Sequence, residues 1–128
     1  MDATGTGGLS RTDAVERECL FCRIARREVH ADVLFEDDRV LAFRDINPQA
    51  PVHVLVIPKR HIGSLADLTG SDEDLMGHTF VVASSLASEL GVIDGFRVVG
   101  NCGEKAGQSV FHIHIHLLGG RRFGWPPG

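Results

Sequence analysis

The amino-acid sequence predicts an α+β domain with a five-stranded, mainly antiparallel sheet and two helices. Short apolar runs of strand length are mostly adjacent in the sequence, two stretches have helical periodicity, and turn residues separate them. The chain has 128 residues, of which 43% are hydrophobic and 23% charged, so it fits one domain with a modest core. We expect this domain to span residues 13–128, after a Gly- and Thr-rich tail at 1–12 that we expect to be disordered.

The individual elements follow from the spacing of apolar residues. The first helix is expected over residues 13–27, and the second over 71–90, where Gly91 ends it. Three acidic residues in the first turn of the second helix favour a helix N-terminus at that point. The expected strands cover residues 33–36, 40–43, 53–57, 96–99 and 110–118.

Charge, hydropathy and cysteine content narrow the range of partners. The net charge of −4 does not favour binding to nucleic acid or to an anionic membrane. No apolar run approaches the roughly 18 residues of a membrane span, and the N-terminus lacks the apolar core of a secretory signal. We therefore expect a cytoplasmic protein. Its three cysteines argue against a disulfide framework, and we expect Cys102, after an apolar run, to be buried.

Three histidines alternate with apolar residues between Phe111 and Leu117. Side chains on a strand point alternately to opposite faces, so His112, His114 and His116 are predicted to share one face, roughly 6.5–7 Å apart. Phe111 and the apolar residues at every second position would share the other face, which helices must cover. The histidines would then lie on a rigid support, as a functional site requires.

Two chemistries are compatible with this row of histidines. Two histidines at positions i and i+2 can ligate one metal ion, with His53 or His61 as a further ligand. Alternatively, a neutral imidazole attacks phosphorus and water then hydrolyses the phospho-imidazole. The turn before the strand, Gly107–Ser109, favours the second chemistry, because glycine lets backbone N–H groups converge on an anion and Ser109 adds a hydroxyl. A metal site remains the alternative.

The residues around the histidines resemble a known family. The sequence Gly-Gln-Ser-Val-Phe-His-Ile-His-Ile-His-Leu-Leu at 107–118 resembles the signature of the histidine-triad (HIT) family, His-φ-His-φ-His-φ-φ with φ apolar. Residues 35–59 resemble the N-terminal half of that family in order and spacing, and 118–128, ending in Trp-Pro-Pro-Gly, resemble its Hint branch. The resemblance covers nearly all of residues 18–128. It implies a HIT-like fold whose sheets join across a homodimer, with Trp125 near the partner's pocket.

The resemblance also implies an activity. A Hint-like enzyme cleaves the P–N bond of a purine nucleoside 5′-phosphoramidate, such as an aminoacyl-AMP or AMP-lysine type of compound. His114 would be the nucleophile and carry a covalent nucleotidyl intermediate, His116 and Ser109 would bind phosphoryl oxygens, and His53 would orient His114. Asp45 would bind the ribose hydroxyls of this AMP-like ligand. The other implied nucleotide-binding residues are Leu20, Phe21, Ile24, Phe43 and Ile46 around the base, and Asn101, Gly107, Gln108 and Val110 near the phosphate.

Some bacterial members of the family carry a structural zinc, and the resemblance implies one here on Cys19, Cys22, His61 and His112. No cofactor is implied for catalysis. Two alternative functions remain, a dinucleoside polyphosphate hydrolase and a nucleotide-binding regulatory protein with little turnover. Ser109 and the C-terminal tail favour the phosphoramidase over the first alternative, because hydrolases of that type usually carry Thr at the position of Ser109. Gly124 stands where the family often has a larger residue. This departure concerns the selectivity for the leaving group, not the chemistry.

Overall fold

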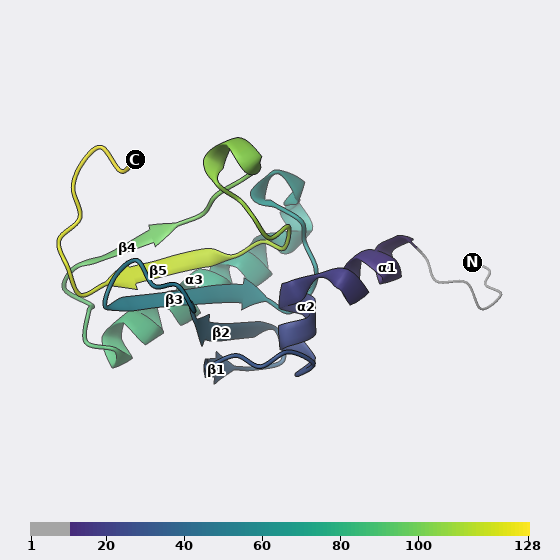
Figure 1. Ribbon diagram of the computed structural model, residues 1–128, viewed down its shortest axis with the longest axis horizontal. Coiled ribbons are helices and arrows are strands. Elements are labelled where there is room, and N and C mark those ends of the chain that lie inside the picture. Colours follow the sequence, from purple (N-terminus) through teal and green to yellow (C-terminus); the bar gives the residue numbers. More distant parts are fainter. Residues whose placement is uncertain (1–10) are drawn as a thin grey trace.

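The computed structural model describes residues 11–128 and contains one five-stranded antiparallel sheet in the order β1-β2-β3-β5-β4 (Figure 1). Its strands are β1 (Val33–Glu36), β2 (Val40–Arg44), β3 (Val52–Pro58), β4 (Phe96–Val99) and β5 (Ile115–Gly119). The predicted fold class is therefore confirmed. The tail expected at 1–12 lies outside the described residues, except that α1 (Arg11–Glu18) begins at its last two positions.

The two faces of the sheet carry different helices. The long helix α3 (Glu73–Glu89) packs against one face, where Val54 and Val56 of β3 meet Val82 and Leu86. The short helix α2 (Leu20–Ala25) covers the other face, where its Phe21 and Ile24 pack on apolar residues of β2 and β3. Figure 1 shows α3 behind the sheet and α2 near the end of β3. Burying a large aliphatic or aromatic side chain in this way contributes roughly 1.5–3 kcal/mol.

The first predicted helix, 13–27, is wrong in one respect, because the chain breaks at Cys19 into α1 and α2. Cys19 has extended backbone angles, φ −67° and ψ 122°, and its sulfur accepts a hydrogen bond from the N–H of Cys22 at 3.5 Å. Cys19 is thus the N-cap of α2, a position more often filled by Ser, Thr, Asp or Asn. The break brings both sulfurs to the same end of α2.

The last predicted strand, 110–118, is also wrong at its start. β5 begins only at Ile115, opposite Val56, and residues 110–114 form no ladder with β3. The carbonyl of Pro58, at the end of β3, instead accepts a hydrogen bond from the ring of His112. Phe111, expected on the apolar face, is 50% exposed. The other residues expected on that face, Ile113, Ile115 and Leu117, are buried.

The remaining elements lie close to their predicted positions. The helix expected from residue 71 begins as a 3₁₀ turn, Gly70–Asp72, whose capping box joins Thr69 and Asp72 before α3 starts. Cys102, expected to be buried, is only partly buried. Between residues 11 and 128 no helix combines the length and the apolar character needed to cross a membrane.

Candidate functional site

A pocket of about 360 Å³ opens between α2, the end of β2 and the segment before β5. Phe21, Ile24, Phe43 and Leu55 form apolar walls, a surface suited to a flat ring. The polar residues of the pocket are Asp45, Ser109, His114 and His116, together with His30 and Arg44.

His114 is held in one tautomer by the backbone. Its Nδ1 lies 2.7 Å from the carbonyl oxygen of His112, which can only accept, so Nδ1 carries the proton. The other ring nitrogen, Nε2, is therefore the one that is free of this backbone contact. His114 is 8% exposed, and Phe21 packs on its ring at 5.0 Å between centroids and an angle of 88°. The chain thus presents an imidazole of fixed orientation at the pocket.

His53 and His116 form a second pair on the same face of the sheet. The backbone N–H of Gln49 donates to Nδ1 of His53 at 3.0 Å, so the proton of His53 is on Nε2. That Nε2 lies 2.9 Å from Nδ1 of His116 and 3.4 Å from a carboxylate oxygen of Asp45. His116 accepts at Nδ1 and consequently carries its proton on Nε2.

This pairing corrects the expected role of His53. The resemblance implied that His53 orients His114, but His53 contacts His116, and the carbonyl of His112 orients His114. His53 is on β3 and His116 on β5, and both side chains lie on the face that α2 covers, because His116 is directly opposite Leu55 in the ladder. Strand alternation could place the two histidines on one face, but the sequence could not identify which histidines touch.

The pKa values of this pair favour the neutral forms. Burial, together with the nearby His114 and His53 and against the attraction of Asp45, lowers the pKa of His116 to about 4. Burial also lowers the pKa of His53, again against the attraction of Asp45. Near pH 7 both rings are therefore uncharged, and His116 offers an N–H donor at Nε2.

The glycine-rich turn before the histidines differs from the predicted anion cradle. Gly107 has φ +96°, a left-handed conformation that glycine adopts readily, and ends the 3₁₀ turn Glu104–Ala106. The N–H groups of Gly107 and Gln108 donate to the carbonyls of Glu104 and Gly103, so they do not face a ligand. The hydroxyl-bearing Ser109 is exposed at the pocket.

Gln108 is a structural residue, which corrects its assignment to the nucleotide. Its side chain is buried, accepts from the N–H of Gly103 at 2.8 Å, and donates to the carbonyls of Gly63 and Val110 at 2.8 and 3.1 Å. These bonds tie the turn to the loop after β3. Gln108 thereby fixes where Ser109 and Val110 stand at the pocket.

The four predicted metal-ligating residues meet at one point. Ligand atoms of Cys19, Cys22, His61 and His112 all lie within 4.8 Å of one another. Nδ1 of His112 is 3.4 Å from the sulfur of Cys19 and 3.5 Å from that of Cys22, whose sulfur is 3.3 Å from Nδ1 of His61. Zinc bonds of about 2.3 Å to sulfur and about 2.05 Å to nitrogen, at the tetrahedral angle, separate the two ligand atoms by about 3.5 Å. The spacing therefore fits a tetrahedral zinc ion.

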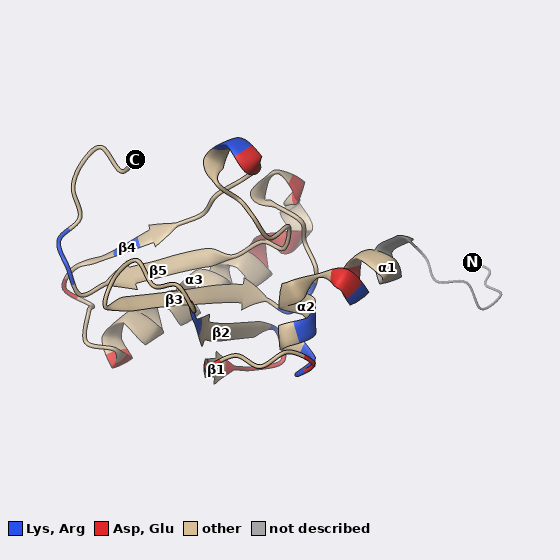
Figure 2. Ribbon diagram, in the orientation of Figure 1, with Lys and Arg blue, Asp and Glu red and all other residues tan. Residues whose placement is uncertain are grey.

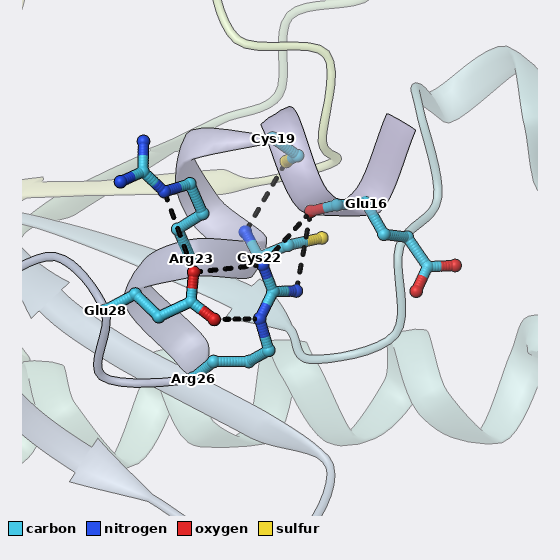
Figure 3. A network of polar contacts seen from close by, with 6 residues as sticks. All are labelled: Glu16, Cys19, Cys22, Arg23, Arg26 and Glu28. Atoms are coloured by element: carbon cyan, nitrogen blue, oxygen red, sulfur yellow. Dashed lines mark hydrogen bonds and ion pairs between the residues drawn. The ribbon is translucent and has the colours of Figure 1, made fainter. Parts of the chain in front are cut away.

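The protonation of the cluster also suits a cation. Nε2 of His112 donates to the carbonyl of Pro58 at 2.7 Å, which leaves the lone pair of Nδ1 for a ligand. Burial and the neighbouring Cys19 raise the pKa of the Cys22 thiol to about 12, so the cation must supply most of the stabilisation of a thiolate there. Figure 3 shows Cys22 between Cys19, whose sulfur accepts from its N–H, and Arg26, which pairs with Glu28 and donates to the carbonyl of Glu16.

A second group of potential ligands, Asp45, His53 and His116, also lies within 4.8 Å. Its hydrogen bonds do not suit a metal, because Nε2 of His53 carries the proton that His116 accepts. His112 and His116 belong to different clusters, and His114 belongs to neither. The alternative in which neighbouring histidines of the row ligate one ion is therefore wrong.

Most of the residues predicted for a nucleotide line the pocket, and a few do not. Ile46 lines it with a side chain that is 99% exposed, so this part of the rim is open. Asn101 lies in an adjacent pocket, and Gly107 lines neither of the two. The sequence-based prediction missed Val29, His30, Ala31, Arg44 and Leu55. Of these, Leu55 could have been found, because it alternates with His53 on the same strand.

Comparisons with known proteins agree with this geometry. The HIT domain family matches residues 26–123. The chain is 51% identical over 111 residues to an uncharacterized HIT-like protein of Synechocystis sp., covering 87% of this chain and 97% of that protein. A solved HIT family hydrolase from Legionella pneumophila is 50% identical, with a TM-score of 0.86 over 87% of this chain and 100% of that one. A histidine triad nucleotide-binding protein from Candida albicans is 32% identical, with a TM-score of 0.73 over 87% and 85% of the two chains.

Proposed function

Because this chain belongs to the HIT family, we propose that it is a nucleotide-binding hydrolase that cleaves the P–N bond of purine nucleoside 5′-phosphoramidates. The hydrolase and nucleotide-binding names of similar solved structures support the general class. The single observation that carries the proposal is the tautomer of His114. Its Nδ1–H is bonded to the backbone, which leaves Nε2 as the ring nitrogen available for attack at a pocket with apolar walls.

The reaction then has two balanced steps. The lone pair on Nε2 of His114 forms a bond to phosphorus while the P–N bond to the amine breaks, and its electron pair leaves with the amine nitrogen. The amine nitrogen takes a proton from the hydroxyl of Ser109, which is at the pocket, while the neutral His116 donates a hydrogen bond from its Nε2–H to a phosphoryl oxygen. Water then attacks phosphorus and breaks the bond to Nε2, a proton of this water returns to the oxygen of Ser109, and the nucleoside monophosphate is released.

The pocket supports a nucleoside as the remainder of the substrate. A purine is flat and apolar on its faces, and Phe21, Ile24 and Phe43 offer matching walls. Asp45 lines the same pocket, and its carboxylate can accept hydrogen bonds from both hydroxyls of a ribose. One oxygen of Asp45 is already fixed by the N–H of Asn47 at 2.8 Å, which holds the carboxylate in place.

Replacing the nucleophile tests this mechanism. We expect His114→Asn to lower the hydrolysis of an AMP phosphoramidate by at least about a thousandfold, because the covalent step is lost. AMP binding, measured by calorimetry, should persist. In the wild type, a nucleotidyl adduct trapped by a denaturing quench at alkaline pH, where the P–N bond to imidazole is stable, should map to His114 by mass spectrometry. Substantial turnover by the variant would refute the nucleophile assignment.

We further propose that Cys19, Cys22, His61 and His112 hold a structural zinc ion. The tetrahedral spacing of the two sulfurs and two nitrogens supports this metal, and four protein ligands leave no coordination position for substrate. When bound, zinc would stabilise the thiolates and fix the segment that precedes β5. The backbone carbonyl that orients His114 belongs to His112, so one residue joins the metal cluster to the nucleophile.

We also propose that the active form is a homodimer whose sheets join. Two features support it. β4 is an edge strand that could pair with a second copy, and α3 leaves Phe80 and Val81 exposed by 48% and 62%. Trp125, exposed by 84%, lies on the C-terminal segment that could reach the partner.

A further inference from the structure

The cysteine pair at the start of α2, Cys19 and Cys22, encloses two residues that line the proposed nucleotide pocket. These are Leu20 and Phe21, which lie between the cysteines in the sequence. The ring of Phe21 also packs against that of His114, at 5.0 Å between ring centres. A covalent bond between the two cysteines would therefore act directly on a wall of the pocket.

The two sulfurs are close enough to react with each other. Both thiols are free, and the two sulfurs lie within 4.8 Å of each other. The sulfur of Cys19 accepts from the N–H of Cys22 at 3.5 Å, so both side chains are at the same end of α2 (Figure 3). A disulfide joins its sulfurs at about 2.05 Å. Rotation of the two side chains, with a small displacement of the first turn of α2, brings the sulfurs to that distance.

A small oxidant can reach this pair from solvent. A pocket of about 390 Å³ on the other side of Ser109 is lined by Cys19 and His61. Cys19 is partly buried, whereas Cys22 is buried, so a small molecule in this pocket meets the sulfur of Cys19 first. Neither cysteine is on α3 or β4, which keeps the pair outside the surfaces that we propose for association.

The opposite end of α2 is held by ion pairs. Nε of Arg26 lies 2.8 Å from one carboxylate oxygen of Glu28, and Nε of Arg23 lies 3.8 Å from the other. Figure 2 shows basic residues on α2 and in the turn that follows it, with an acidic residue beside them. Because this end is anchored, a displacement at the cysteine pair falls on Leu20 and Phe21.

We propose that Cys19 and Cys22 form a redox-modification site for a hydroperoxide, and that the resulting disulfide weakens nucleotide binding. The inference rests on the proposed function, because the regulated site is the nucleotide pocket. First, the sulfur of Cys19 forms a bond to one oxygen of hydrogen peroxide, the O–O bond breaks, and the other oxygen leaves as water with the thiol proton. The sulfur of Cys22 then attacks the sulfur of this sulfenic acid, the S–O bond breaks, and a second water leaves with the proton of Cys22. The two thiols lose two electrons in total, and the peroxide is reduced to two waters.

The disulfide also removes two of the four ligands of the proposed zinc site. A cysteine binds metal as a thiolate, and a sulfur in a disulfide is no longer one. Zinc bound by the chain should therefore be released on oxidation. This release is measured independently of hydrolysis.

Oxidation of the purified full chain tests the site. Protein treated with hydrogen peroxide, and then separated from the excess, is compared with protein kept under a thiol reductant. The tryptic peptide 18–23 contains both cysteines, so oxidation should make it lighter by two hydrogen atoms in a mass spectrum. We expect the dissociation constant of AMP, measured by calorimetry, to rise by about tenfold, because the aromatic wall at Phe21 is displaced. Thiol reductant and zinc should restore it.

Cysteine variants identify the residues responsible. Cys102→Ser is the matched control, because Cys102 is a free cysteine outside the cluster. It should form the disulfide and lose affinity for AMP to the same extent as the wild type. In Cys19→Ser, which cannot form the disulfide, the affinity should not respond to peroxide. Thermal melting checks that each variant is folded, and the oxidised and reduced wild type decide the matter if Cys19→Ser is not.

The outcomes separate the two proposals. If reduced protein binds AMP, and peroxide either forms no bond between Cys19 and Cys22 or leaves the affinity unchanged, the redox site is overturned and the proposed function stands. A loss of affinity that peroxide also produces in Cys19→Ser would overturn the assignment to this pair. Reduced protein without affinity for AMP would refute the proposed function and the regulation of its site together.

Discussion

At the residue scale, the three histidines of the row differ in which ring nitrogen is bonded. His112 donates from Nε2 to Pro58 and turns Nδ1 toward the cysteines. His114 donates from Nδ1 to the backbone, and His116 accepts at Nδ1 from His53. In our proposals, one residue type thus supplies a metal ligand, a nucleophile and a hydrogen-bond donor. The hydrogen-bond partner decides the chemistry that each imidazole can perform.

The neutral state of His116 gives stability a defined pH dependence. The folded-state pKa is about 4, below the ordinary histidine pKa of 6.5 that we take for the unfolded chain, so the unfolded chain binds more protons between these values. The free energy of unfolding is therefore highest above about pH 6.5 and falls as the pH drops toward about 4. Because His116 is partly exposed, we expect it to account for about 1 kcal/mol of the loss in the free energy of unfolding between pH 7 and pH 5.

Urea unfolding of the wild type and of His116→Gln, at pH 7 and pH 5, measures this contribution of His116 to the free energy of unfolding. The variant lacks the titrating ring, so its stability should fall less than that of the wild type over the same interval. His53, whose pKa burial also lowers, remains in both proteins, and glutamine keeps an acceptor for its N–H. Identical pH dependence in the two proteins would contradict a buried, neutral His116.

The site could be predicted from the sequence only in part. The residue types and their order identified the cysteine pair, the histidine row and Asp45 as candidates. The sequence could not predict that the carbonyl of His112, and not His53, orients the ring of His114, because hydrogen-bond partners depend on the tertiary structure. Gln108 was misassigned for the same reason, since its three partners come from both sides of it in the sequence.

At the scale of elements, periodicity located four of the five strands within a residue or two, and also α3. It missed the break at Cys19, because the capping group is a thiol and the apolar pattern continues across it. It extended β5 too far, because residues 110–114 alternate like a strand although the ladder between β3 and β5 stops at the pair Val56–Ile115. In both places the chain departs from regular structure at a predicted metal ligand, Cys19 or His112.

The zinc proposal belongs to this scale, because the ligands come from α2, the loop after β3 and the segment before β5. We expect protein purified without chelator to contain one zinc per chain by elemental analysis, and Cys22→Ser to contain almost none. Because the ion crosslinks three segments, its removal should lower the melting temperature by at least about 5 °C.

Cys102→Ser serves as the matched control for this measurement. Cys102 is a free cysteine outside the cluster, so its replacement should preserve both the zinc content and the melting temperature. Wild-type protein with far less than one equivalent of zinc, after purification in zinc-containing medium, would contradict the structural metal site.

At the scale of the whole molecule, the functional features lie on one side of the sheet. The proposed nucleotide pocket and the cysteine–histidine cluster lie on or beside the face that α2 covers, whereas α3 packs against the opposite face. Because the pocket is on the face that α2 covers, a second copy of the chain could bind at α3 and at the edge strand β4 without closing the pocket. A homodimer through those surfaces is compatible with an open nucleotide pocket in each copy.

Sedimentation velocity tests the dimer. We expect the wild type at micromolar concentration to have twice the mass of the chain, and Val81→Glu to have the mass of one chain, because a charge replaces an apolar side chain that is 62% exposed on α3. Val15→Glu is the control, since Val15 is similarly exposed on α1, far from α3 in sequence and on a different helix. It should remain dimeric. A wild type that is monomeric, or a dimer that Val15→Glu dissociates and Val81→Glu does not, would contradict association through α3.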